Sequence, residues 1–209
     1  MKIAVIGANG KAGKLIVAEA VNRGEDVTAV VRNENKSAAK KVIVKDIMSL
    51  NKDDLKGFDV VIDCFGAWTP ETLPLHTTTS QHLCDILSGT DIRLLIIGGA
   101  GSLYTDKTHT MQVFKTPDFP AEYLSTATAQ SNELDELRKR NDVKWTFVSP
   151  AGDFQPEGER TGKYILAGEE FTLNSKGESM ISYADYAIAM VDEATKGNHI
   201  QQRISVLKE

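Results

Sequence analysis

The feature that most constrains this chain is the G-x-x-G-x-x-G spacing of Gly7, Gly10 and Gly13, directly after the apolar run Ile3–Ile6. In a nucleotide-binding turn, the first glycine allows a tight bend, the second lets the backbone approach a pyrophosphate, and the third lets a helix pack on the strand. A helix expected over Lys14–Arg23 would supply free N–H groups and the positive end of its dipole to that pyrophosphate. The spacing therefore predicts a dinucleotide-binding loop.

The surrounding sequence favours this prediction over a glycine-rich turn that merely packs tightly. A strand precedes the loop, an amphipathic helix follows it, and a second strand at Val27–Val31 completes a unit of about thirty residues. Gly24 stands where a glycine typically ends a helix. The residues of the loop expected at the cofactor are Gly7, Asn9, Gly10, Lys11, Ala12 and Gly13.

Short apolar runs rich in β-branched residues alternate with helical patterns along the chain. Strands are expected at Ile3–Ile6, Val27–Val31, Val42–Val44, Val60–Cys64, Leu94–Ile97, Thr146–Val148 and Ile204–Val206, and helices at about 12–23, 75–88, 121–140 and 184–196. Continuous apolar strands are typical of a parallel sheet whose two faces are both covered by helices. The alternation predicts an α/β fold: a doubly wound, mainly parallel Rossmann-type sheet with helices on both faces.

The 209 residues fit a single NAD(P)-binding domain in which residues 1–150 form the cofactor-binding core. Two stretches break the alternation. Residues 99–120 show little periodicity, and residues 151–180 form an irregular insertion on the substrate side, with a hairpin expected between Tyr164–Leu166 and Glu170–Leu173. Both stretches follow the carboxyl ends of strands, where open α/β sheets bind ligands, so we expect them to be walls of the substrate site.

Composition and residue spacing argue against several classes of partner. The net charge of −5 predicts no binding to nucleic acid or to an acidic membrane surface. No apolar run reaches the roughly eighteen residues that span a bilayer. The cysteines Cys64 and Cys84 are expected to be small core residues of a cytoplasmic protein. His76 and His82 are six positions apart, unlike zinc ligands on one helical face, so each is expected at the surface or as a cap, and no metal is expected.

The end of the second strand bears on the choice of coenzyme. An acid there binds the ribose 2′-hydroxyl of NAD, whereas an arginine accommodates the 2′-phosphate of NADP. The sequence has Arg32 at this position and no acid before Glu34. A guanidinium can grip a phosphate with two hydrogen bonds, and Lys11 could add charge, so NADP(H) is expected over NAD(H). The alternative is that Arg32 is a solvated cation at a strand end.

Two further turns are expected at the cofactor. After the third strand, Asp46 and Ile47 are placed to clasp the adenine. After the fourth strand, Phe65, Gly66 and Ala67 form a turn whose small residues would let the backbone come close to the cofactor.

These segments resemble those of atypical short-chain dehydrogenase/reductases. The resemblance is carried by Gly7–Gly13, Val31–Arg32, Asp46–Ile47, Phe65–Ala67 and Trp145–Pro150. The chain is most similar to an NAD(P)H-binding group that includes flavin reductase, biliverdin reductase B and bacterial NADH-flavin reductases, and Ser182–Ala187 resembles the segment that opens the late helix of that group. The resemblance implies a bacterial NAD(P)-binding protein with Ser149 and Pro150 also at the cofactor.

The chain departs from standard members of this superfamily at the catalytic acid. They use a Tyr-x-x-x-Lys pair, but here Tyr123 is followed four residues later by Ala127, and no lysine appears before Lys139. We therefore expect that Tyr123 is not a catalytic acid. Hydride transfer to a flavin suits such a site, because the electron-poor ring needs less acid catalysis from the protein. The expected acceptor is a flavin (FMN or FAD) or a quinone-like small molecule.

A rival hypothesis from another class is a non-catalytic regulatory protein that senses NADP(H), since the missing pair fits both functions. Catalytic residues stay unassigned. Ser102 and Tyr104, just past the fifth strand, are weak candidates for orienting an acceptor, and hydrogen bonding within the loop is the alternative. His109 is expected to be a solvated loop residue. The sequence leaves open whether the protein is a monomer or a homodimer.

Overall fold

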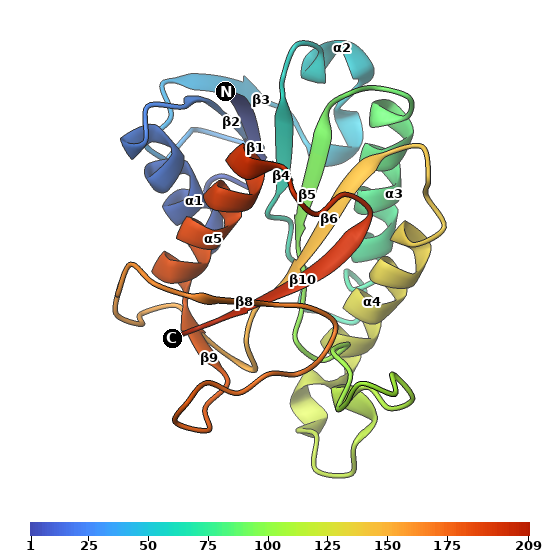
Figure 1. The fold of residues 1–209 in the computed structure, drawn as a ribbon. Helices are drawn as coiled ribbons and strands as arrows, with labels where there is room; N and C mark the ends of the chain where they lie inside the picture. The colour runs from blue at the N-terminus through green and yellow to red at the C-terminus, as the bar shows by residue number, and fades with distance from the viewer.

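Eight strands form the central sheet of the computed structural model, which describes residues 1–209 (Figure 1). The strands of the whole chain are β1 (Lys2–Ile6), β2 (Asp26–Val31), β3 (Lys41–Val44), β4 (Val60–Asp63), β5 (Arg93–Ile97), β6 (Lys144–Ser149), β7 (Asp153–Gln155), β8 (Ile165–Ala167), β9 (Met180–Ser182) and β10 (Gln202–Leu207). The order across the main sheet is β3-β2-β1-β4-β5-β6-β10-β8, and only β8 is antiparallel to its neighbour. The predicted doubly wound, mainly parallel α/β fold is confirmed.

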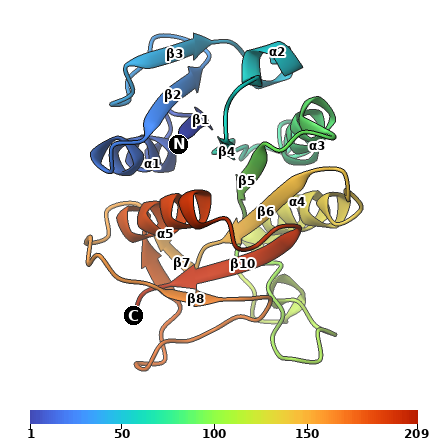
Figure 2. The same ribbon diagram turned by 45° about the horizontal axis from the view of Figure 1, so that its top comes forward.

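Two helices cover each face of the sheet. Helices α1 (Lys11–Asn22) and α5 (Tyr183–Lys196) pack together on one face, and α3 (Leu75–Leu87) and α4 (Ala121–Leu137) pack together on the other (Figure 2). The remaining helical turns are η1 (Ile47–Ser49), α2 (Lys52–Leu55) and η2 (Val113–Lys115). These turns are too short to produce a periodic apolar pattern, which is why the sequence did not predict them. No helix combines the length and the apolar character that crossing a membrane requires.

Alternate residues of the central strands face opposite helix layers. In β1, Ile3 and Val5 belong to the core under α1 and α5, whereas Ala4 and Ile6 belong to the core under α3 and α4. All four side chains are buried. Because both faces of the strand are covered, its sequence is apolar without alternation.

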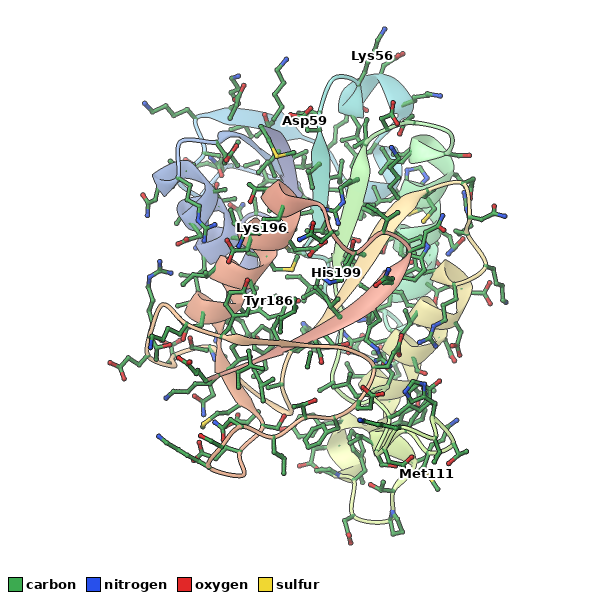
Figure 3. The ribbon with its side chains drawn as sticks, viewed as in Figure 1. Lys56, Asp59, Met111, Tyr186, Lys196 and His199 are labelled. Atoms are coloured by element: carbon green, nitrogen blue, oxygen red, sulfur yellow. The ribbon has the colours of Figure 1, made fainter.

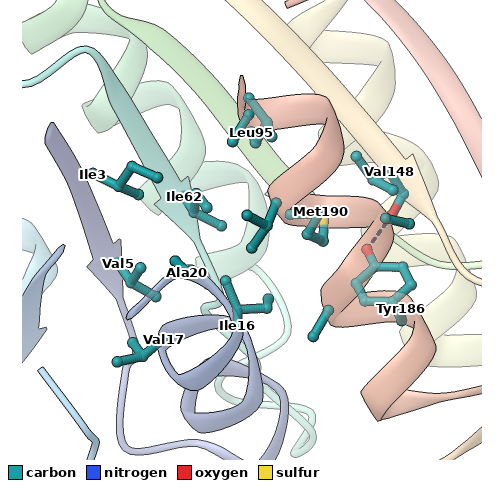
Figure 4. Close-up of a cluster of buried hydrophobic side chains, with 14 of the residues drawn as sticks. Ile3, Val5, Ile16, Val17, Ala20, Ile62, Leu95, Val148, Tyr186 and Met190 are labelled. Carbon is teal, nitrogen blue, oxygen red and sulfur yellow. Dashed lines mark hydrogen bonds between the residues drawn. The ribbon is translucent and has the colours of Figure 1, made fainter. Parts of the chain in front are cut away.

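One buried hydroxyl joins α5 to the sheet. Tyr186 is fully buried among the apolar side chains of the α1 and α5 layer, and its hydroxyl donates a 2.6 Å hydrogen bond to the carbonyl oxygen of Val148 on β6 (Figure 4). Burial raises the pKa of the Tyr186 hydroxyl, so it remains a donor at physiological pH. This bond fixes the start of α5 relative to the end of β6.

The irregular insertion does not contain the predicted hairpin. Strand β8 pairs with β10 at the edge of the main sheet, and β7 pairs in parallel with β9 as a separate two-stranded sheet. The predicted pairing of Tyr164–Leu166 with Glu170–Leu173 is therefore wrong. The open edge of β10 offers unpaired backbone groups to β8, and Glu170 forms a bridge to Tyr104 instead.

The carboxyl ends of the parallel strands lie at one end of the molecule. Met111, from the stretch that follows β5, lies at the opposite end from Lys56 and Asp59, which precede β4 (Figure 3). The loops that could bind a ligand are therefore gathered at the end marked by Met111.

We expect Tyr186→Phe to lower the free energy of unfolding by about 1 kcal/mol, because the ring volume stays while a buried hydrogen bond is lost. Urea denaturation measures the change. Tyr123→Phe is the matched control: Tyr123 is 61% exposed, so its variant should differ from the wild type by less than about 0.5 kcal/mol. Equal stabilities for the two variants would contradict the role assigned to Tyr186.

Candidate functional site

The order in which the chain adds strands to the sheet reverses between β1 and β4, which lie side by side and parallel. From β1 the chain winds outward to β2 and β3, and then returns to β4 on the other side of β1. In open α/β sheets the ligand crevice lies outside the carboxyl ends of the strands at this switch point. Gly7 follows β1 and Cys64 follows β4, so these two turns border the place where this crevice is expected.

Close backbone contacts explain two of the three glycines. Gly7 has a φ of +70°, and a Cβ atom there would lie 2.8 Å from the carbonyl oxygen of Cys64. A Cβ atom at Gly13 would lie 2.4 Å from the carbonyl oxygen of Gly7. At Gly10 the nearest atom would be 3.2 Å away, which a small adjustment relieves. Gly7 and Gly13 are thus required by packing, whereas Gly10 keeps the outer surface of the loop free of a side chain.

The first turn of α1 has backbone donors without partners. The helix begins at Lys11, inside the glycine motif, and Gly10 provides no side-chain cap. Helix α5, in contrast, is capped by the Ser182 hydroxyl. The first helical bond is from the Lys14 N–H to the Gly10 carbonyl, at 3.0 Å. The donors that precede it and have no backbone acceptor are the N–H groups of Lys11, Ala12 and Gly13. With no acid in this turn, these donors suit an anionic ligand.

Asn9 links the glycine loop to the segment after β2. Its amide nitrogen donates to the Glu34 carbonyl at 2.8 Å, and its amide oxygen accepts from the Lys36 N–H at 2.7 Å. Arg32 opens this segment directly after β2 and its side chain is exposed. Both ends of the Asn9 amide therefore have a partner in the protein, and the exposed Arg32 side chain begins the segment that Asn9 ties to the loop.

The turn after β3 holds Asp46 and Ile47. The carboxylate of Asp46 is exposed and accepts a 2.9 Å hydrogen bond from the Met48 N–H, which caps η1. The side chain of Ile47 is buried in the core under α3 and α4. Of the two, Asp46 is the residue that can reach a ligand.

Ser149 and Pro150 lie at the end of β6, and both are buried. The Ser149 hydroxyl has no hydrogen-bond partner in the protein. Buried polar atoms without a partner are rare, and one at the carboxyl end of a central strand fits a site where a ligand supplies the missing partner. This orphaned hydroxyl and the free donors of α1 fit the polar groups of a dinucleotide.

Asp63, which sequence analysis did not single out, ends β4 beside the crevice. It is 2% exposed, and its carboxylate accepts a 2.9 Å hydrogen bond from the Phe65 N–H. This bond shapes the turn that contains Phe65, Gly66 and Ala67, in which Ala67 is buried. Burial raises the pKa of Asp63 to about 6. The signal in the sequence was an acid at the end of an otherwise apolar strand.

His76 contradicts the prediction that it lies at the surface or caps an element. It is 2% exposed, and its Nε2 lies 3.1 Å from the carbonyl oxygen of Ala67. The face of helix α3 that carries His76 packs against the turn after β4. The spacing from His76 to Leu83 and Leu87 places these three residues on one helical face, and this pattern could have revealed the burial. His82 is half-buried, and its Nε2 lies 3.0 Å from the Leu50 carbonyl oxygen.

Glu133 on α4 completes this cluster and was also missed. It is 2% exposed, and its Oε2 lies 3.7 Å from Nδ1 of His76. Burial and the nearby Asp63 raise the pKa of Glu133 well above its usual value. Asp63, His76 and Glu133 form a buried polar cluster under the turn. The structure gathers no group of three such side chains placed to hold a metal ion.

The two irregular stretches meet at Tyr104. Its N–H donates to the Glu169 carbonyl at 2.9 Å, and its carbonyl accepts from the Phe171 N–H at 2.8 Å. The ring of Tyr104 stacks on His109, whose Nε2 lies 2.7 Å from the carboxylate of Glu170. The stretches expected to be walls of the substrate site are thus fastened to each other.

The hydroxyl of Ser102 points into the protein. Ser102 is buried, and its Oγ accepts a 3.2 Å hydrogen bond from Arg203 on β10. Arg203 also forms a salt bridge with Glu169. The Ser102 hydroxyl is thus bound to β10, and its carbonyl accepts from the Gln112 amide within the loop. Tyr104 lies at the junction of the two walls.

A family model described as NAD(P)H-binding matches residues 7–196. The crystal structure of a "putative NADH-flavin reductase" from Streptococcus pneumoniae is 60% identical, covers 100% of both chains and has a TM-score of 0.98. The uncharacterized protein YwnB of Bacillus subtilis is 45% identical over 212 residues, which cover 100% of this chain and 99% of YwnB. A "putative epimerase" from Bacteroides thetaiotaomicron is 34% identical, covers 100% of this chain and 98% of its own, and has a TM-score of 0.85.

We expect Asp63→Asn to remove a pH dependence of stability. The pKa of Asp63 is about 6 in the folded protein and roughly 3.9 in an unfolded chain. Its stabilising contribution is therefore present below about pH 4 and is lost as the pH rises through about 6. Asparagine keeps an acceptor for the Phe65 N–H, so the variant should exceed the wild type by about 2–3 kcal/mol at about pH 8.

Urea denaturation of both proteins at about pH 4 and about pH 8 measures this difference. Asp91→Asn is a control, since Asp91 is exposed and pairs with Lys144 at the other end of the strands. A difference between Asp63→Asn and the wild type that stays constant across this pH range would contradict the assignment.

Proposed function

The chain belongs to the NAD(P)H-binding family, and we propose that it is a reductase that transfers hydride from NADPH to a flavin or a quinone-like acceptor. The observation that carries the proposal is the uncapped first turn of α1 at the switch point of the sheet, beside a loop that Gly10 keeps free of a side chain. The name of the Streptococcus pneumoniae relative supports the reductase activity and the flavin acceptor.

Residues from several turns would each bind a different part of the coenzyme. The N–H groups at the start of α1 would bind the pyrophosphate, and Arg32 would bind the 2′-phosphate. The Phe65–Ala67 turn would let the backbone lie along the coenzyme, and the Ser149 hydroxyl would gain its missing partner. When bound, the reduced nicotinamide supplies a hydride to the acceptor ring.

Helix α4 favours an electron-poor ring as the acceptor over a carbonyl. Tyr123 is exposed near the start of this helix, Ala127 is buried one turn later, and the helix contains no lysine. A carbonyl needs a proton donor at its oxygen as hydride arrives, whereas a flavin or quinone accepts hydride with less help from the protein. What the protein must then supply is the alignment of the two rings.

We expect the wild-type protein to oxidise NADPH in the presence of excess FMN, and we expect Gly10→Val to abolish both turnover and NADPH binding. A branched side chain would occupy the surface where the pyrophosphate lies, while the packing at Gly7 and Gly13 stays intact. Absorbance at the nicotinamide band follows turnover, and isothermal titration follows binding. Wild-type affinity in a folded Gly10→Val protein would contradict the site.

The same assay tests the rival function. A regulatory protein that senses NADP(H) would bind NADPH tightly and yet oxidise it with no flavin or quinone. That result would contradict the reductase and favour the sensor, because both functions use the coenzyme site and only one needs turnover.

We expect Arg32→Ala to weaken NADPH binding roughly ten- to a hundredfold and to leave NADH binding nearly unchanged, because only NADPH carries the 2′-phosphate. Higher salt should reduce the preference of the wild type for NADPH by screening the charge. Lys56→Ala is the control, since it removes an exposed positive charge at the opposite end of the molecule (Figure 3). Equal weakening of both coenzymes by Arg32→Ala would show that Arg32 does not select the phosphate.

A further inference from the structure

His76 and Glu133 form a buried polar pair under the turn that follows β4. They come from different helices, α3 and α4, and each is 2% exposed. Glu133 Oε2 has no hydrogen-bond partner, and the basic group that faces it is His76, with Nδ1 at 3.7 Å. A hydrogen bond with Ser80 also acts on the Glu133 carboxyl and lowers its pKa, against the larger effect of burial. The other ring nitrogen of His76 contacts the backbone of Ala67. The pair therefore links α4 to the turn through one imidazole ring.

The imidazole can engage Ala67 in two ways. Nε2 lies 3.1 Å from the Ala67 carbonyl oxygen and 3.4 Å from the Ala67 nitrogen. A neutral imidazole carries its proton on one nitrogen only, so Nε2 either donates to the carbonyl oxygen or accepts from the N–H. The protonation of Nδ1 decides between these two bonds: a bare Nδ1 leaves the proton on Nε2, which then donates, and a protonated Nδ1 leaves Nε2 as an acceptor.

We propose that neutral Glu133 directs the proton of His76 to Nε2, and that His76 thereby positions the Phe65–Ala67 turn for the coenzyme. The shorter contact of Nε2 is with the Ala67 carbonyl oxygen, which places the proton on Nε2 and leaves Nδ1 bare. The hydroxyl of a protonated Glu133 carboxyl can donate to a bare Nδ1, whereas a carboxylate has only acceptors. If Glu133 loses its proton, the carboxylate favours a proton on Nδ1, and Nε2 can hold the turn only through the Ala67 N–H. The inference rests on the proposed function, since it assigns His76 to the same coenzyme site.

The surroundings keep both groups neutral. Burial lowers the pKa of His76 and raises that of Glu133 well above its ordinary value. The other titratable group that acts on this pair is Asp63 from the end of β4, which further disfavours a charge on Glu133. The 3.7 Å separation is longer than a hydrogen bond, so the donation requires the Glu133 carboxyl to move closer to Nδ1 of His76.

Nuclear magnetic resonance of ¹⁵N-labelled histidines reads the position of the proton directly and needs no coenzyme. Near pH 7 we expect the wild type to show His76 neutral with its proton on Nε2, and Glu133→Gln to show the same state, because the glutamine amide also donates to Nδ1. A wild-type His76 that is protonated on Nδ1, or on both nitrogens, would overturn the inference even if NADPH binds normally.

The dissociation constant of NADPH tests the consequence. We expect wild-type affinity to fall as the pH rises through the raised pKa of Glu133, whereas Glu133→Gln should keep its affinity over the same range and match the wild type within about twofold near neutrality. A purely structural role would not produce a pH dependence that glutamine removes. Parallel pH profiles for the two proteins would overturn the inference.

Two substitutions of His76 separate its hydrogen bond from its volume. His76→Leu should weaken NADPH binding about tenfold, and His76→Gln should restore most of this loss, since its amide can donate at the position of Nε2. His82→Leu is the matched control, because His82 lies on the same helix and contacts the distant Leu50 carbonyl.

Wild-type affinity in His76→Leu would overturn the inference. If His76→Leu does not fold, the proton position and the pH profiles of the wild type and Glu133→Gln decide the question. Failure of the wild type to bind any nicotinamide coenzyme would instead overturn the proposed function, whatever state His76 shows.

Discussion

The rest of the structure depends on a three-way contact of backbone atoms at the start of the chain. The loop after β1 touches the carbonyl of Cys64 on one side, and α1 touches the carbonyl of Gly7 on the other. Neither contact leaves room for a Cβ atom, so Gly7 and Gly13 set how closely α1 approaches β1 and β4. This approach aims the uncapped start of α1 at the crevice. The packing of the core and the geometry of the anion site therefore have the same cause.

The core layer under α3 and α4 contains the unfavourable part of this region, which is a group of buried ionisable side chains. Its core is apolar except where α3 and α4 meet the turn after β4, and there Asp63, His76 and Glu133 are buried together. Burying two carboxyl groups with one imidazole is unfavourable unless they stay neutral or find donors. Strongly shifted pKa values cluster at functional sites. The raised pKa values of Asp63 and Glu133, beside the end of β4, agree with a functional site there.

The sequence predicted the features that depend on local pattern and missed those that depend on distant contacts. The strands of the sheet and the long helices follow from apolar periodicity, and the loop Gly7–Gly13 follows from its spacing between a strand and a helix. The partner of β8 is β10, about forty residues further along the chain, and local pattern suggested a nearer one. His76 is a different case: local spacing on α3 could have predicted its burial, but its partners Ala67 and Glu133 lie in other parts of the chain.

The two halves of the crevice are built differently, and this bears on which acceptors the fold can serve. On the side proposed for the coenzyme, most contacts would come from backbone groups and glycines, joined by the side chains of Arg32 and Ser149, which leaves less scope for variation. On the acceptor side the walls are fixed by backbone bonds at Tyr104 and by the buried Arg203, but they expose large apolar side chains such as Met111 and Leu173. Exposed side chains can change without disturbing the core. Under the proposed function, the fixed half would bind the dinucleotide and the variable half would select what reacts with it. Such a division agrees with relatives that share this fold and carry names from different reaction classes.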